Sequence, residues 1–137
     1  MNLTSVTSNL VSAWNSGDVQ RIAGLYARDA VMVHALFPET LRGREAILAA
    51  ESPMFGAFSD IDWKLVDSIA SDDRVAVEWQ VEATHSGEMP TPAGPLAPTG
   101  RRIVVKGSSH FRFDEKGSIL SEHRYLDGAA MFAQLTG

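Results

Sequence analysis

Three side chains in this sequence are of types that move protons near neutral pH. They are His34, at the end of an apolar segment, and His123 and Asp127, which lie close together near the C-terminus. An imidazole titrates near neutrality and can take a proton from a carbon next to a carbonyl group. A carboxylate can accept or return a proton when it is partly removed from water. We therefore expect these three residues to be the catalytic groups of an acid–base reaction.

Each of these candidates also has a structural role that the sequence leaves open. His34 fits the rim of a cleft, where its ring would bond to water. Asp127 precedes a short segment with helical character, and a carboxylate at such a position caps free backbone N–H groups. His123 is either a core histidine with satisfied hydrogen bonds or a polar group in a pocket. The small polar residue expected opposite it, Ser109, favours the pocket.

The composition argues against several kinds of site. The chain has 137 residues, which is enough for a single domain over 1–137 with a substantial core. It contains no cysteine, which rules out disulfides, thiolate zinc sites and a cysteine nucleophile. The four histidines lack the spacing of metal ligands, so we expect no metal and no cofactor.

The charge and the apolar segments indicate the kind of partner. The net charge is −5 and neither Lys nor Arg forms a run, which argues against nucleic acid or an anionic membrane. The N-terminal segment MNLTSVTSNL lacks the basic start and the apolar core of a signal peptide. No apolar run approaches the length of a membrane span, so a cytoplasmic location is expected.

The first part of the chain has helical periodicity. Apolar residues recur at helical spacing in three segments, which we expect to form helices over 4–15, about 18–27 and 44–51. A short strand is expected at 30–34. Pro53 is expected to break or restart the third helix, because proline has no N–H for the helical hydrogen bond.

The second part alternates with a period of two, which predicts antiparallel strands over 61–70 and 75–84 and a long hairpin over 101–127. Between them, 86–100 is rich in Pro and Gly and reads as a long functional loop, and 128–135 is expected to form a short helix. Helices followed by strands indicate an α+β fold. We expect a cone, in which a curved antiparallel sheet carries the N-terminal helices on its concave face.

The register of the hairpin decides which residues share a face. A three-residue loop at 115–117, ending on a glycine with positive φ, places Ser109 opposite His123. The odd positions from 105 to 127 would then point into the cone, and the even positions away from it. The outward set includes His110, Glu122 and Arg124.

Aromatic residues predict what the cone binds. An apolar cavity with a few polar groups is typical of sites for small molecules. We expect a small apolar or aromatic molecule, bound by Trp14, Tyr26, Trp79, Ser109, Phe111 and Tyr125. Aromatic side chains at these positions also fit a plain core. The outer face of the sheet, which is apolar in patches, is expected to support a homodimer.

Several segments of the chain resemble a known family. These are NSGDVQRIAGLYARDAV, LRGREAI, THSGE with PTGRR, HFRFDEKGSI and the closing DGAAMFAQLTG. They are similar to SnoaL-like polyketide cyclases. These belong to the nuclear transport factor 2-like superfamily, which also contains the ketosteroid isomerases and whose fold is called cystatin-like. The resemblance implies the conical fold, a hydrophobic pocket, and cyclase or isomerase chemistry that proceeds without a cofactor.

The resemblance also implies roles for particular positions. His34 stands where ketosteroid isomerases have their catalytic carboxylate base. Ser109 and Leu10 stand where those enzymes have their acid donor and oxyanion tyrosine, so steroid isomerisation is not expected. The strand over 75–84 has no arginine of the kind found in limonene-epoxide hydrolases. Asp127 matches the acid–base aspartate of SnoaL-like cyclases.

Two hypotheses follow from these observations. In the first, the protein is a cyclase or isomerase in which His34 abstracts a proton, Asp127 donates or relays one, and His123 with Ser109 polarises an oxygen. The reaction would be an intramolecular aldol-type cyclisation or a proton transfer on a small apolar carbonyl compound. In the second, the protein is a non-catalytic binding domain of the same fold.

Overall fold

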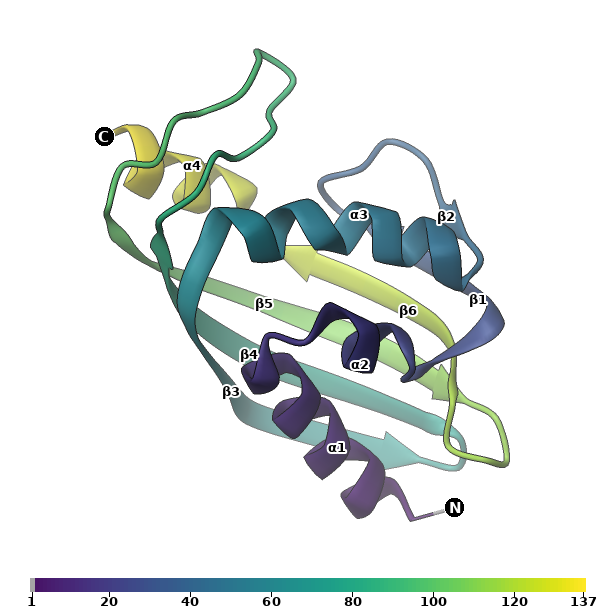
Figure 1. The fold of residues 1–137 in the computed structure, drawn as a ribbon. Helices are drawn as coiled ribbons and strands as arrows, with labels where there is room; N and C mark the ends of the chain where they lie inside the picture. Colours follow the sequence, from purple (N-terminus) through teal and green to yellow (C-terminus); the bar gives the residue numbers. More distant parts are fainter. Residues whose placement is uncertain (1) are drawn as a thin grey trace.

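The computed structural model describes residues 2–137, and a six-stranded curved sheet forms its centre (Figure 1). The strand order is β2-β1-β6-β5-β4-β3, and all neighbours pair antiparallel except β1 and β6, which are parallel. The strands are β1 Tyr26–His34, β2 Leu41–Arg42, β3 Phe58–Ser71, β4 Arg74–His85, β5 Arg102–Phe113 and β6 Ile119–Leu126.

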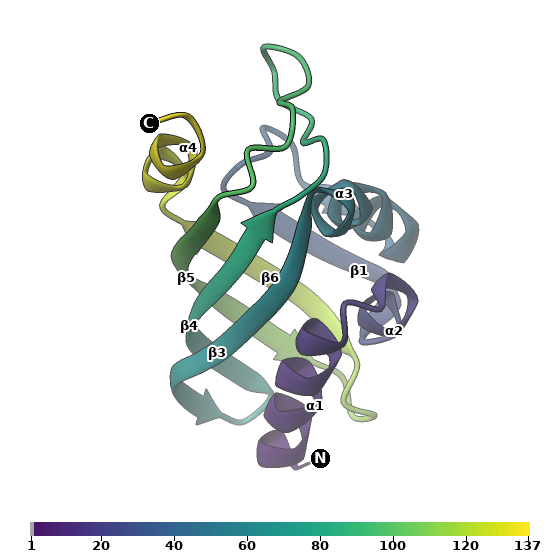
Figure 2. The same cartoon turned by 60° about the vertical axis from the view of Figure 1, so that its left-hand side comes forward.

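The helices lie on one side of this sheet and at one end of it. They are α1 Leu3–Ser16, α2 Val19–Ala23, α3 Arg44–Ala57 and α4 Gly128–Thr136. Figures 1 and 2 show α1, α2 and α3 along the concave side, whereas α4 and the loop 86–100 lie at the end away from the N-terminus. This confirms the expected α+β cone with N-terminal helices on the concave face. No helix within 2–137 is long and apolar enough to cross a membrane.

Helices α2 and α3 and strand β1 have other limits than the sequence predicts. Helix α2 ends at Ala23, and β1 already begins at Tyr26, whose side chain is fully buried. Helix α3 continues through Pro53 to Ala57. Proline removes a hydrogen bond to the carbonyl four residues earlier, at Ala49. Because Ala49 and Pro53 are both exposed, water can bind that carbonyl, and the helix tolerates the proline.

The turn of the last hairpin has the predicted geometry. Gly117 has φ +85°, its N–H donates to the Asp114 carbonyl at 3.1 Å, and the Asp114 N–H donates to the Ser118 carbonyl at 2.9 Å. A three-residue loop that ends on a left-handed glycine therefore joins β5 to β6, as expected.

The register beyond this turn is not the predicted one. Phe113 pairs with Ile119 but Arg112 pairs with Ser121, so that Leu120 forms a β-bulge. A bulge inserts one residue into one strand, and side chains beyond it change face. The inward residues of β6 are consequently Glu122 and Arg124, not the odd-numbered set.

Candidate functional site

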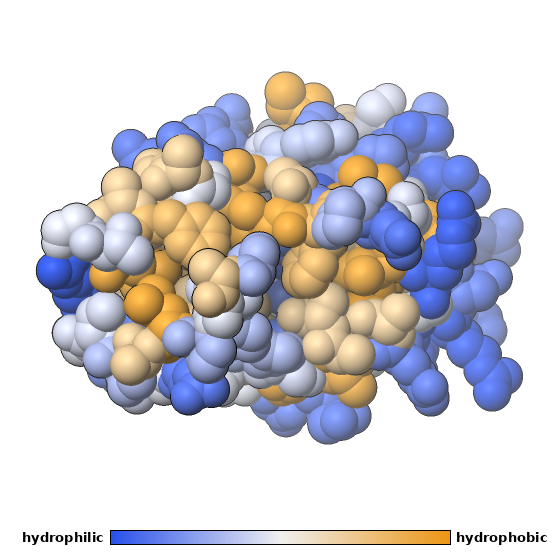
Figure 3. Space-filling model, turned by 90° about the horizontal axis from the view of Figure 1, so that it is seen from above, coloured by the Kyte–Doolittle hydropathy of each residue, from blue (hydrophilic) through white to orange (hydrophobic). Residues whose placement is uncertain are grey.

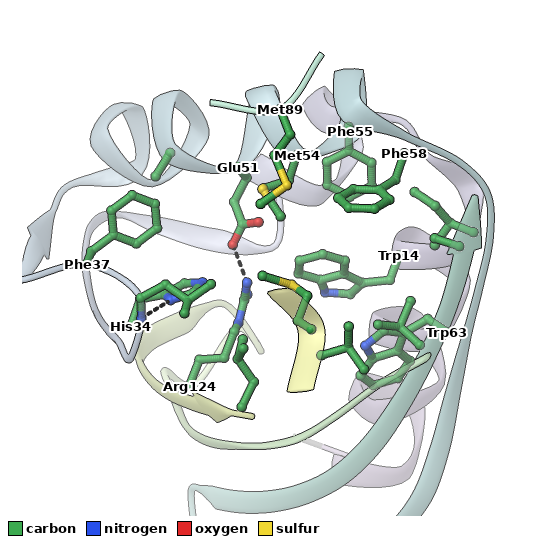
Figure 4. Close-up of a pocket in the computed structure, with 18 of the residues that line it drawn as sticks. Trp14, His34, Phe37, Glu51, Met54, Phe55, Phe58, Trp63, Met89 and Arg124 are labelled. Atoms are coloured by element: carbon green, nitrogen blue, oxygen red, sulfur yellow. Dashed lines mark hydrogen bonds and ion pairs between the residues drawn. The ribbon is translucent and has the colours of Figure 1, made fainter. Parts of the chain in front are cut away.

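A cavity of about 470 Å³ lies between the sheet and the helical layer. Its walls are mostly apolar and include all three tryptophans of the chain, Trp14, Trp63 and Trp79. Phe55, Phe58 and Met54 close the side formed by α3 and the start of β3 (Figure 4). Seen from the end that carries α4 and the loop 86–100, apolar side chains gather among polar ones (Figure 3). The size and lining suit a small apolar molecule.

Four ionisable side chains line this cavity, and they form a single group. His34 on β1 and Arg124 on β6 are register partners across the parallel pair of strands. Glu122 lies two residues before Arg124 on the same face of β6, and Glu51 extends toward both from α3. All four have less than a tenth of their surface exposed. Charged groups in such a setting are stabilised only when they pair with one another.

Arg124 is the centre of the group. Its Nε donates to Glu122 Oε2 at 2.8 Å and its Nη2 to Glu122 Oε1 at 3.3 Å. Its Nη1 donates to Glu51 Oε1 at 2.5 Å, and Figure 4 marks this bond with a dashed line between the two labelled residues. The guanidinium also lies over the ring of Trp14, 4.8 Å from the ring centroid. Arg124 is therefore held on three sides, and every one of its nitrogens donates to a carboxylate.

Glu122 is fixed in its ionised form. Besides Arg124, it accepts the hydroxyl hydrogens of Tyr26 at 2.5 Å and of Ser109 at 2.9 Å. Burial alone raises the pKa of Glu122, but Arg124 and these hydrogen bonds outweigh it, so that the pKa is lowered. Trp79 Nε1 donates to Ser109 Oγ at 3.1 Å and extends the network to β4. With both of its oxygens occupied, Glu122 holds Arg124 and is poorly suited to take a proton.

Glu51 is the carboxylate that can accept a proton. Burial raises the pKa of Glu51, with the Glu122 charge adding to this rise and Arg124 opposing it. Only Oε1 has a hydrogen-bond partner within residues 2–137, namely Arg124. Because Glu51 lines the cavity, Oε2 is the oxygen available to a bound molecule. A carboxylate with a raised pKa in an apolar cleft fits a general base.

His34 is suited to donate a hydrogen bond, not to remove a proton. Its burial, followed by the nearby charge of Arg124, lowers the pKa of His34 to about 4, so that the ring is neutral at pH 7. The Leu36 N–H donates to Nδ1 at 3.1 Å. The proton of the neutral ring is therefore on Nε2. The edge of the ring packs against Phe37, with 4.8 Å between the centroids.

The structure places four of the expected substrate-binding residues in the cavity wall. Trp14, Trp79, Ser109 and Phe111 line the cavity, together with His34. The fifth, Tyr26, is fully buried outside the lining, and its hydroxyl binds Glu122. Its contribution is to the position of Glu122, and not to direct contact with a ligand.

The expected positions of His123, Tyr125 and Asp127 are wrong. The bulge at Leu120 turns His123 and Tyr125 to the outer face, where His123 pairs with His110 and both histidines are exposed. Tyr125 is 47% exposed. Asp127 is exposed, and its Oδ1 accepts the Ala130 N–H at 2.9 Å at the start of α4. Asp127 therefore caps helix α4, which was the structural alternative to a catalytic role.

Sequence reasoning missed Glu51, Glu122 and Arg124. The last two were assigned to the outer face because a bulge cannot be read from alternation alone. Glu51 had a usable signal. It follows the buried Ile47 by four residues on α3, so its side chain shares the buried face of that helix. A carboxylate at such a position needs a buried cation as its partner.

The comparisons with known proteins identify the family. The model of the SnoaL-like domain matches residues 8–122. The chain belongs to this family. No curated protein matches the chain by sequence.

Solved structures of similar proteins share the fold of this SnoaL-like chain. AclR of Streptomyces galilaeus, described as a candidate hydroxylase, is 23% identical with a TM-score of 0.82 over 96% of this chain and 79% of its own. IdmH of Streptomyces antibioticus, described as a candidate polyketide cyclase, is 25% identical with a TM-score of 0.79, and both chains are fully covered. A protein of Catenulispora acidiphila with a ketosteroid isomerase-like fold, solved with trimethylamine, is 19% identical. Its TM-score is 0.75, over 94% of this chain and 90% of its own.

Proposed function

We propose that this SnoaL-like protein is a cyclase or isomerase that performs acid–base chemistry on a small apolar carbonyl compound, without a cofactor. The observation that carries the proposal is that the two carboxylate oxygens of Glu51 have different surroundings. Oε1 is bound by Arg124, and Oε2 is left to the cavity. The pair thus orients one basic oxygen toward an apolar space of suitable size.

The first step is a proton transfer from carbon to oxygen. Glu51 Oε2 takes a proton from the carbon next to the substrate carbonyl, and the C–H electron pair forms the enolate. His34 Nε2–H donates a hydrogen bond to the enolate oxygen, where negative charge develops. A neutral imidazole serves here because it does not give up its proton outright. His34 is therefore assigned to the oxygen, and not to the carbon as the sequence suggested.

The second step determines the product. In an isomerisation, protonated Glu51 returns its proton to a different carbon of the enolate. In a cyclisation, the enolate carbon attacks a second carbonyl carbon of the same molecule, and the resulting alkoxide takes the proton from Glu51. Both routes restore the ionised carboxylate. The family membership and the described cyclase role of IdmH support cyclisation.

Proton abstraction can be measured without the natural substrate. In D₂O, ¹H NMR follows the exchange of the protons next to the carbonyl of 2-tetralone, a small apolar ketone. We expect the protein to accelerate this exchange above the buffer rate. Glu51→Gln keeps an oxygen for Arg124 but removes the base, and should lower the rate by about 10²-fold or more.

Glu45→Gln is the matched control, because Glu45 is exposed in the first turn of the same helix. It should exchange 2-tetralone at the wild-type rate. The proposal is wrong if Glu51→Gln exchanges as fast as the wild type. Binding of 2-tetralone with no exchange above the buffer rate would instead assign the protein to the second function, a non-catalytic binding domain.

A further inference from the structure

We propose that the cavity admits uncharged carbonyl compounds and excludes the corresponding carboxylates. The inference names the ligand class of the site described above and so rests on the proposed function for the location of that site. It concerns binding, however, and not turnover. Ketones, esters and lactones would enter, whereas an ionised acid of the same shape would be rejected.

The first reason is that Arg124, the only cation in the cavity lining formed by residues 2–137, already uses each of its three nitrogens to bind a protein carboxylate. Arginine often binds ligand carboxylates through two parallel N–H bonds. Here Glu122 occupies that edge of the guanidinium through Nε and Nη2, at 2.8 and 3.3 Å. Glu51 occupies Nη1 at 2.5 Å. The Trp14 ring covers one face of the group.

The second reason is the sign of the charge in the lining. When both glutamates are ionised, two carboxylates and one guanidinium leave an excess of negative charge, and the ring of His34 adds no positive charge while it is neutral. A ligand carboxylate would lose its water and meet this excess without a cation of its own. Removing an unpaired charge from water is strongly unfavourable, and like charges at close range add to that cost.

The third reason is that the free polar groups suit an uncharged ligand. His34 Nε2–H can donate to a carbonyl oxygen, which needs no countercharge. Beyond the four ionisable side chains, the lining is mostly apolar, with Met54, Phe55 and Phe58 opposite Trp63. An uncharged carbonyl compound thus satisfies the donor and leaves the apolar walls in contact with its carbon skeleton.

Three probes with one ring system test the inference. Binding is measured at about pH 8. At this pH methyl 2-naphthoate and 2-acetylnaphthalene are uncharged, whereas 2-naphthoate is fully ionised. The three tryptophans of the chain all line the cavity, so quenching of intrinsic fluorescence reports occupancy. We expect the two uncharged probes to bind the wild-type protein about ten-fold or more tightly than 2-naphthoate.

Glu51→Gln tests the cause of the discrimination. The substitution removes the excess negative charge, so the ratio between methyl 2-naphthoate and 2-naphthoate should fall several-fold. Glu45→Gln, exposed on the same helix, should leave the ratio unchanged. Should Glu51→Gln fail to fold, the wild-type ratio alone still decides the main claim.

Equal or tighter binding of 2-naphthoate to the wild type overturns the inference, since it would mean that Arg124 still binds a ligand carboxylate. Failure to bind any of the three probes overturns it as well. These results are independent of the exchange of 2-tetralone. A protein that selects uncharged probes but exchanges no protons would disprove the enzyme assignment alone.

Discussion

Glu51 and Arg124 join the helical layer to the sheet through a buried ion pair, with 2.5 Å between Glu51 Oε1 and Arg124 Nη1. One residue belongs to α3 and the other to β6, which lie far apart in the chain. The pair therefore fixes the position of the proposed base relative to the sheet that carries His34. Its loss should affect both stability and chemistry.

Arg124→Met should strongly destabilise the fold. The substitution leaves Glu51 and Glu122 buried without their cation, and removing one partner of a buried pair costs about 3–5 kcal/mol. Arg112→Met is the matched control, because Arg112 lies on the exposed side of β5 and its pair with Asp73 spans 3.7 Å. Its cost should be about 0–1 kcal/mol. Urea denaturation measures both free energies of unfolding, and equal values would contradict a structural role for the buried pair.

Tyr26→Phe should weaken the support of Glu122. Burial, followed by the Glu122 charge, keeps the pKa of Tyr26 well above its ordinary value, so its hydroxyl remains a donor. Removing a hydrogen bond to a charged group costs about 1.5–3 kcal/mol. The other tyrosine of the chain, Tyr125, is 47% exposed, and Tyr125→Phe should change the unfolding free energy by less than about 0.5 kcal/mol. It should also leave the binding of methyl 2-naphthoate unchanged, because Tyr125 lies outside the cavity.

The stability of the protein should depend on His34 in mildly acidic solution. Its pKa is about 4 in the folded protein, compared with about 6.5 in an unfolded chain. Between these values the unfolded chain binds a proton that the folded one does not. The contribution of neutral His34 is thus complete above about pH 6.5 and is lost as the pH falls through about 4.

His34→Gln should accordingly reduce the rise in unfolding free energy between about pH 4.5 and pH 7, by about 2 kcal/mol. Urea denaturation of both proteins at the two pH values gives this difference. A direct test is the NMR titration of the His34 ring. A midpoint near that of an unfolded chain would show that the ring is not shielded by the cavity.

Gly107→Ala should disturb the wall of the cavity. A Cβ atom at Gly107 would lie 2.5 Å from Trp79 Cζ2 and 2.5 Å from the Tyr125 carbonyl oxygen. Crowding of this kind costs about 1–3 kcal/mol. Gly56→Ala on α3 meets nothing within 4 Å and should be neutral or stabilising by up to about 1 kcal/mol. Urea denaturation and near-ultraviolet circular dichroism of the tryptophans separate the two variants.

The strands and turns of this fold follow from local sequence, whereas the register of its last hairpin does not. The alternation of β4 and the loop before Gly117 were enough to predict strands and turn, because both are local properties. The bulge at Leu120 depends on how β5 and β6 fit the curved sheet, and a single extra residue exchanged the faces of His123 and Arg124. Glu51 could be assigned to the buried face of α3, but the charged centre as a whole could not be predicted. Its members come from α3, β1 and β6, and only the fold brings them together.

The loop 86–100 begins and ends at one point of the sheet. The His85 N–H donates to the Arg101 carbonyl and the Gly100 N–H to the His85 carbonyl, both at 2.8 Å. Between these bonds the chain pairs with itself at Met89 and Leu96 and contributes to the cavity wall. Because its two ends meet, such a segment can change in length at little entropic cost to the remaining fold. A longer loop in a relative would therefore deepen the cavity for a larger ligand. The charged centre formed by α3, β1 and β6 would stay unchanged.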